Sequence, residues 1–240
     1  MSITVVKPGV QSTIQSRPRA GLRHQGVPSG GAADPLSLAL ANKLVGNAWD
    51  APAIEAALLG PTLRFERDCA IAVTGAVAAT TLNGATVGQH RTVFAREGDE
   101  FAVGACETGA RVYIAVAGGF AVPEVLGSAA TNLQAAFGGF EGRALAAGDI
   151  LETVGGDVGQ METPAEFRLG LTSSRALRTC DAAETALLED ADTLFDTNWI
   201  VDRRADRMGL RLDGPALSVS SDGRMPSAAV FPGTVQCPED

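Results

Sequence analysis

The chain has 240 residues, of which 45% are hydrophobic, and this is enough apolar material for one large core or two smaller ones. Acidic residues outnumber basic residues by 28 to 19, and the resulting net charge of -9 disfavours a phosphate backbone or an anionic membrane surface as a partner. These values predict a globular protein that binds neither nucleic acid nor a membrane.

The sequence also gives little sign of export, membrane insertion or metal binding. Its start, MSITVVKPGV, lacks a basic region followed by a long apolar run, so we expect a cytoplasmic protein. Two histidines, His24 and His90, are too few and too far apart to indicate a metal site or a catalytic pair. No CxxC pair exists, which argues against a zinc site and a disulfide framework. The cysteines are Cys69, Cys106, Cys180 and Cys237.

The first expected elements are a strand at residues 3–6 and a helix that follows Asp34-Pro35. Aspartate is a favoured N-cap and proline a favoured first helical residue. Leu36, Leu40 and Leu44 then recur at helical spacing, and Gly46 can end the helix. The stretch GVPSGGAADP before it holds three glycines, which suit either a tight turn or a close approach of backbone N–H groups to a ligand.

Further short β-branched runs predict strands at residues 71–73, 93–95, 101–103 and 112–116. Turn residues separate them, and their regular spacing favours a barrel or sandwich over a βαβ fold. A second helix is expected at residues 183–195, and the polar, glycine-bearing stretch at 155–168 suggests a boundary. The turn signals are Asn83-Gly84, Glu97-Gly98-Asp99, Thr108-Gly109 and Gly118-Gly119.

Several longer motifs together resemble the carboxyltransferase A/B family, which includes allophanate hydrolase subunit 2, the KipI antagonist and the C-type subunit of 5-oxoprolinase. The resemblance spans nearly the whole chain. In order, the motifs are PGVQSTIQ (8–15), GVPSGGAADPLSLALANKLVGN (26–47), EAALLGPTLRF (55–65), VTGA (73–76), YIAVAGGF (113–120), Gly127-Ser128 with Thr131, GGFEGRALAAGD (138–149), DRMGLRLDG (206–214) and PGTVQCP (232–238).

The resemblance implies a mainly β fold with a few short helices, built from cyclophilin-like β-barrel subdomains. The first would occupy residues 1–160 and carry the glycine-rich loop and helix; the second would occupy 161–240. Because the family continues beyond PGTVQCP, we expect the second barrel to be incomplete, and we expect residues 165–240 to need a partner subunit or to pack in a reduced form. At residues 15–19 this chain has QSRPR where the family has Gln-Asp-x-Gly-Arg, so the loop conformation should differ.

The family implies three functions that the sequence alone leaves open. The first is a subunit of an ATP-dependent 5-oxoprolinase, paired with a KipI-like or allophanate hydrolase subunit 1-like subunit and a third, LamB/YcsF-type subunit. The second is the carboxyltransferase subunit of a biotin-dependent urea or amide carboxylase. The third is a non-catalytic regulator that binds a KipI-like partner. Because no P-loop or biotin-attachment motif is present, ATP or biotin would be carried elsewhere in the complex.

Candidate site residues follow from these motifs, and each also has a purely structural alternative. The 5-oxoprolinase-like form of the DRMG motif begins with Asp206, which could accept a lactam N–H or act as a base. Arg207 is the preferred ligand for a substrate carboxylate, against an ion pair with Asp206. The expected catalytic residues are thus Asp206 and Arg207. The expected substrate-binding residues are Ser29, Gly30, Gly31, Asp34, Arg143 and Arg211.

The alternatives for the other positions are equally specific. The glycine loop could be only a tight connection into the helix, or Ser29, Gly30 and the helix start could present donors to a carboxylate or carbonyl oxygen. Asp34 is a stronger candidate for an N-cap than for a catalytic acid. Arg143 could instead form a capping or interface salt bridge.

Overall fold

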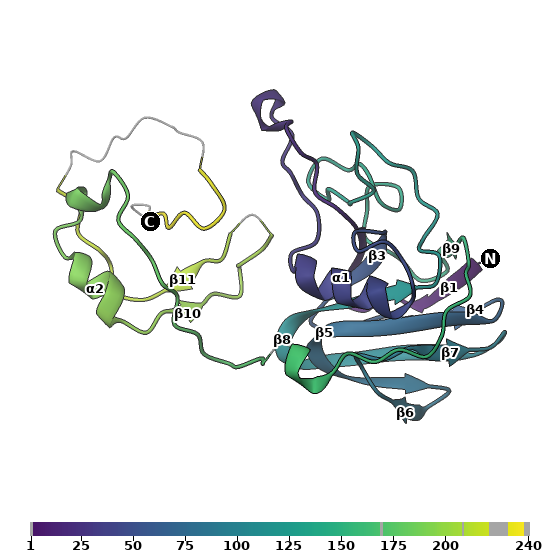
Figure 1. Ribbon diagram of the computed structural model, residues 1–240. Helices are drawn as coiled ribbons and strands as arrows, with labels where there is room; N and C mark the ends of the chain where they lie inside the picture. Colours follow the sequence, from purple (N-terminus) through teal and green to yellow (C-terminus); the bar gives the residue numbers. More distant parts are fainter. Residues whose placement is uncertain (1, 169, 208, 221–229, 238–240) are drawn as a thin grey trace. The chain divides into compact units, whose positions relative to one another are not determined.

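A computed structural model describes residues 2–168, 170–207, 209–220 and 230–237. The chain divides into two units, Met1–Arg175 and Ala176–Asp240 (Figure 1). The sequence places the boundary between two barrel subdomains earlier, at residues 160/161, and that subdomain boundary stays a prediction. The described part of the chain contains no helix that is long and apolar enough to cross a membrane.

The first unit is built around one curled antiparallel sheet. Its path runs β2-β3-β8-β4-β1-β9, and β5 pairs with β6, β7 and β8. The long strand β8 bonds to β3, β4 and β5, so the sheet bends into a half-barrel and confirms the expected mainly β fold. The strands are β1 Ser2–Lys7, β2 Gln11–Gln15, β3 Ala53–Ala57, β4 Thr62–Phe65, β5 Cys69–Leu82, β6 Ala85–Val87, β7 Val93–Ala95, β8 Glu100–Val116 and β9 Ile150–Glu152. The helices are η1 Arg23–Gln25, α1 Pro35–Leu44 and η2 Ala165–Phe167.

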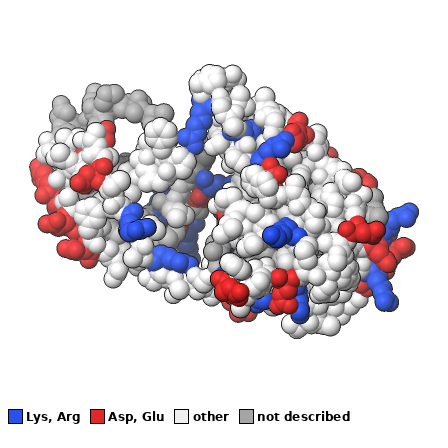
Figure 2. Space-filling model, in the orientation of Figure 1, with Lys and Arg blue, Asp and Glu red and all other residues white. Residues whose placement is uncertain are grey.

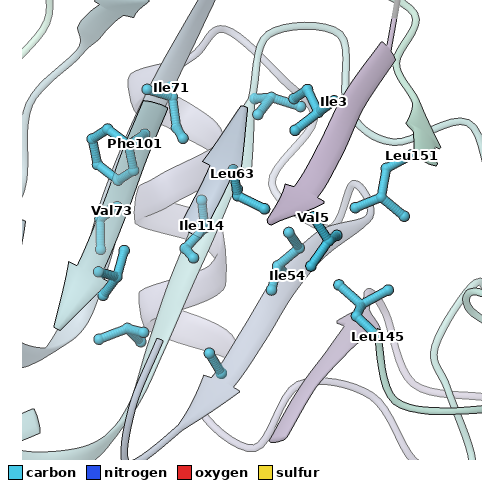
Figure 3. Packing of buried hydrophobic residues seen from close by; sticks show 14 of the residues in the cluster. Ile3, Val5, Ile54, Leu63, Ile71, Val73, Phe101, Ile114, Leu145 and Leu151 are labelled. Atoms are coloured by element: carbon cyan, nitrogen blue, oxygen red, sulfur yellow. The ribbon is translucent and has the colours of Figure 1, made fainter. Parts of the chain in front are cut away.

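The main core lies on the concave side of this sheet. Figure 3 shows side chains from separate strands pointing toward one another, among them Ile3, Leu63, Phe101 and Ile114, each at most 1% exposed. Alternate residues of β1 and β4 face this core, as period-two patterning requires. Burial of apolar surface is the principal stabilising contribution to folding.

Two of the expected strands are in fact one. Residues 101–103 and 112–116 both belong to β8, and the expected turn at Thr108-Gly109 is not a chain reversal. Gly109 has a φ of 89°, and the pairing between β5 and β8 shifts register in this region. Glycine therefore marks a bulge here, which lets a long strand bend with the sheet.

Helix α1 begins and ends as the sequence predicts, but it buries a different face. Leu36 is 52% exposed, and the buried positions are Ser37, Leu38, Ala41, Asn42 and Leu44. The leucine stripe inferred from Leu36, Leu40 and Leu44 was therefore wrong. Small and polar residues lie against the sheet because the helix packs closely on β5 and β8, and Thr74 donates a hydrogen bond to the Ser37 carbonyl at 2.6 Å.

The second unit has only short elements. They are η3 Thr185–Leu187, α2 Ala191–Asp196, β10 Ile200–Val201 and β11 Leu212–Asp213, with β10 antiparallel to β11. The single helix expected at residues 183–195 was wrong, because Leu188 at the end of η3 adopts extended backbone angles. Among the described residues of this unit none is buried, and Phe231 and Ile200 are 78% and 70% exposed. The incomplete second barrel is thus confirmed.

Candidate functional site

The glycine-rich segment forms the second half of a long excursion between β2 and α1. In Figure 1 it is the dark purple segment that extends away from α1 and ends in the short turn η1. Two backbone bonds close its base: Arg19 N–H donates to the Ser29 carbonyl at 2.7 Å, and Ala32 N–H donates to the Ser16 carbonyl at 3.2 Å. The segment is therefore an ordered hairpin-like loop.

Two consecutive glycines are required where this loop turns toward the helix. Gly30 and Gly31 have φ values of 56° and 87°, which side-chain-bearing residues rarely adopt. A Cβ at Gly31 would lie 2.9 Å from the Pro18 backbone nitrogen. The tight-connection reading therefore describes Gly31 correctly.

A buried carboxylate and the single tyrosine of the chain fix the end of the loop. Glu55, only 2% exposed, accepts hydrogen bonds from Ala33 N–H at 2.9 Å and from the Tyr113 hydroxyl at 2.8 Å. The Tyr113 oxygen accepts from Asp34 N–H at 2.7 Å, and Arg111 lies 3.3 Å from the second Glu55 oxygen. Burial, with the Glu55 charge added, raises the pKa of Tyr113, so its hydroxyl stays protonated.

Sequence reasoning missed this anchor. Its signal was a lone glutamate in the otherwise apolar strand AIEAA, together with the only tyrosine, on a neighbouring strand. A buried charge needs partners, so that glutamate predicted a polar cluster.

Asp34 is the N-cap of α1. Its Oδ1 accepts from Ser37 N–H at 3.0 Å and its Oδ2 accepts from the Ser37 hydroxyl at 2.5 Å. Both carboxylate oxygens are thus used to cap the helix. The structural alternative for this residue is confirmed, and its predicted part in substrate binding stays a prediction.

Beyond Gly31, the N–H groups of the loop are used internally, whereas two earlier ones are not. Within the described ranges, the N–H groups of Ser29 and Gly30 have no hydrogen-bond partner. Adjacent backbone N–H groups on a rigid loop can bind a carbonyl or carboxylate oxygen.

Arg143 lies in a different cluster. Its Nη1 and Nη2 bond the two oxygens of Asp149 at 2.7 and 2.9 Å, and Glu141 accepts from it at 2.9 Å. The guanidinium also lies 5.0 Å from the Phe140 ring centroid. Hydrogen bonding to Asp149 raises the pKa of Arg143 and lowers that of Asp149. These contacts are the salt bridge expected as the structural alternative; the substrate-binding role stays a prediction.

The remaining candidates, Asp206, Arg207 and Arg211, lie together in the second unit, and all three are exposed. Asp206 N–H donates to the Gly209 carbonyl at 3.1 Å, and Gly209 N–H donates to Asp206 Oδ1 at 3.3 Å, which closes a tight turn. Met208, inside this motif, is outside the described residues. The catalytic roles of Asp206 and Arg207 stay predictions.

Solved structures with the same fold identify the class of domain. The crystal structure of the Kluyveromyces lactis urea carboxylase superimposes with a TM-score of 0.83 at 32% identity, covering 92% of this chain and 21% of that one. The curled sheet with its anchored glycine loop is thus the fold of a region of a urea carboxylase.

Sequence comparison gives the family. The chain matches the carboxyltransferase domain, subdomain A and B, over residues 25–240, and it belongs to this family. It is 34% identical to the C-type subunit of the Escherichia coli 5-oxoprolinase over 240 residues, 99% of this chain and 77% of that protein. It is 33% identical to the urea amidolyase of Lachancea kluyveri over 232 residues but spans only 12% of that protein's length.

Proposed function

We propose that the chain is a subunit of a heteromeric, ATP-dependent 5-oxoprolinase that opens 5-oxoproline to glutamate. The observation that carries the proposal is one of length and coverage. The chain accounts for 77% of the C-type subunit of the Escherichia coli 5-oxoprolinase, whereas it accounts for 12% of a urea amidolyase. A relative that is itself a subunit is the better guide to what a chain of this size does.

The glycine loop is proposed to polarise the lactam carbonyl. The Ser29 and Gly30 N–H groups would donate to the carbonyl oxygen, and negative charge develops on that oxygen when water attacks the carbon. Support comes from the anchoring of the loop by Glu55 and Tyr113, because a donor pair stabilises a transition state best when it is already fixed in place. Gly31 would supply the turn, and Asp34 would keep the helix start in place beside the substrate.

Charged side chains would complete the reaction. Asp206 would orient or deprotonate the attacking water or the lactam N–H, and Arg207 would bind the substrate carboxylate. Arg211 and Arg143 are proposed as further substrate-binding residues. ATP would be used by the complex and bound outside this chain.

The complex is proposed to contain a KipI-like or allophanate hydrolase subunit 1-like subunit and a LamB/YcsF-type subunit. The exposed apolar side chains of the second unit support a protein partner. Phe195, Ile200 and Phe231 are 53%, 70% and 78% exposed. Apolar surface of this kind is normally covered by another protein surface.

Substitution of Asp206 tests its catalytic role. In an assembled complex, Asp206→Ala should lower ATP-dependent turnover by about a hundredfold, the usual contribution of a positioned acid or base. Asp192→Ala, at an exposed helical position of the same unit, is the matched control and should retain turnover. If Asp206→Ala assembles normally and turns over as fast as wild type, the role assigned to Asp206 is wrong.

Biotin-dependent carboxyl transfer is the second candidate, and the structural match to urea carboxylase favours it. In that case a separate biotinylated carrier would deliver the carboxyl group. Avidin would then abolish activity of the complex, whereas a 5-oxoprolinase would be insensitive to avidin.

A further inference from the structure

Arg19 is the largest fully buried side chain of the protein, with 1% of its surface exposed. Its Nε donates to the Val125 carbonyl at 2.9 Å, and its Nη2 donates to the Ser128 and Ala130 carbonyls at 3.3 and 2.6 Å. The Phe137 ring lies 4.6 Å from the guanidinium carbon. One nitrogen, Nη1, is buried and has no hydrogen-bond partner in the described parts of the chain.

The positive charge of Arg19 is also uncompensated. Within the described residues no carboxylate lies within 4.0 Å of its guanidinium, and its partners are neutral carbonyls. Burial lowers its pKa, which reflects the cost of a desolvated cation. A buried cation without a counter-ion is costly unless an anion binds beside it.

An open cavity of about 420 Å³ lies next to this arginine. Arg19, Arg23, His24 and Ser29 supply its polar lining, and no aspartate or glutamate contributes to it. The lining is therefore positive in a chain of net charge -9. Figure 2 shows acidic and basic side chains interspersed over the visible face of the first unit, so a purely basic lining is a local feature.

The neighbouring groups are arranged to leave Nη1 accessible. A Cβ at Gly30 would lie 3.5 Å from Nη1, so the glycine keeps this side of the guanidinium uncovered. Arg23 Nη2 donates to the Ser29 hydroxyl at 3.3 Å, which holds the second guanidinium beside the same loop. Two guanidinium groups and a hydroxyl thus surround one small space.

We propose that this cavity binds a small carboxylate anion, with Arg19 Nη1 and Arg23 as the charged donors and Ser29 as a third donor. Planar carboxylates match the N–H geometry of guanidinium groups, and charge-assisted bonds of this kind are among the strongest in proteins. The site uses only residues of the first unit. It does not depend on Arg207 or on the identity of the reaction.

Binding to the purified full-length chain tests the proposal without any turnover. Isothermal titration calorimetry at constant ionic strength would compare 5-oxoproline and acetate with 2-pyrrolidinone, the lactam that lacks a carboxylate. Both carboxylates should bind and 2-pyrrolidinone should not. Inorganic phosphate forms a fourth titration, and binding of phosphate without either carboxylate would overturn the assignment.

Variants at the rim of the cavity locate the site. Arg23→Gln should weaken carboxylate binding by at least about tenfold, because a charge-assisted bond is lost, and Ser29→Ala should weaken it by a smaller factor. Arg17→Gln is the matched control: this arginine is in the same loop but pairs with Glu124 at 2.6 Å and does not line the cavity. Failure of both carboxylates to bind, or equal affinity in wild type and Arg23→Gln, would overturn the proposal.

Discussion

Tyr113→Phe removes one hydroxyl that joins the glycine loop to the sheet. The oxygen accepts from Asp34 N–H at 2.7 Å and donates to Glu55 at 2.8 Å. Because Tyr113 is fully buried, phenylalanine keeps the packing and deletes only the bonds. One N–H then loses its partner and a buried carboxylate loses one of its donors, so we expect the free energy of unfolding to fall by about 2 kcal/mol.

Urea unfolding measures this loss directly. Thr86→Val is the matched control, because it removes an exposed hydroxyl from edge strand β6 and should change the free energy of unfolding by less than about 0.5 kcal/mol. A loss of less than about 0.5 kcal/mol for Tyr113→Phe would refute the claim that this hydroxyl anchors the loop.

The same residue gives an independent optical test, because it is the only tyrosine in the chain. Its folded pKa lies above the ordinary value of 10.0, so the folded state holds the proton more tightly than the unfolded state. The sign is therefore that stability falls as pH rises above about 10. Tyrosinate absorbance at about pH 11 should appear in urea but be suppressed in the folded protein. Equal titration in both states would refute the burial argument.

Three further changes test the fold and the charged clusters. Asp34→Ala should cost about 1 kcal/mol of unfolding free energy through loss of the helix cap, seen as a lower urea midpoint. Asp149→Asn should cost about 1 kcal/mol at neutral pH, because its partner Arg143 is partly exposed; since the folded pKa of Asp149 is below 3.8, the difference from wild type should vanish as pH falls below about 4. Gly118→Ala should prevent stable folding, since its Cβ would lie 2.2 Å from the Gly155 oxygen, whereas Gly98→Ala, with nothing within 4 Å, should cost only about 1 kcal/mol. Equal losses for the two glycine variants would contradict the steric argument.

Local signals in the sequence were sufficient for much of the first unit. Asp34-Pro35 predicted the start of α1, and Asn83-Gly84 predicted the turn between β5 and β6, because each depends on the backbone preferences of a few adjacent residues. The bend of β8 was not predictable in this way. Gly109 reads as a turn in isolation, and only its pairing with β5 shows that the strand continues.

The candidate site was only partly visible for the same reason. The glycine loop was identified from its own residues, but its anchors Glu55 and Tyr113 lie far along the chain, on β3 and β8. Arg19 was noted only as a retained motif position, and its buried environment depends on carbonyls contributed by residues 125–130. Contacts between distant segments decide which polar residues are buried, and a single sequence does not record them.

The central claim is that this chain is required for ATP-dependent conversion of 5-oxoproline to glutamate. The most direct measurement is glutamate release by the complete complex, with and without this chain, in the presence of ATP and 5-oxoproline. The account predicts turnover that disappears when the chain is omitted and returns when it is added back. Turnover that continues without the chain, or an intact complex that releases no glutamate, would contradict it.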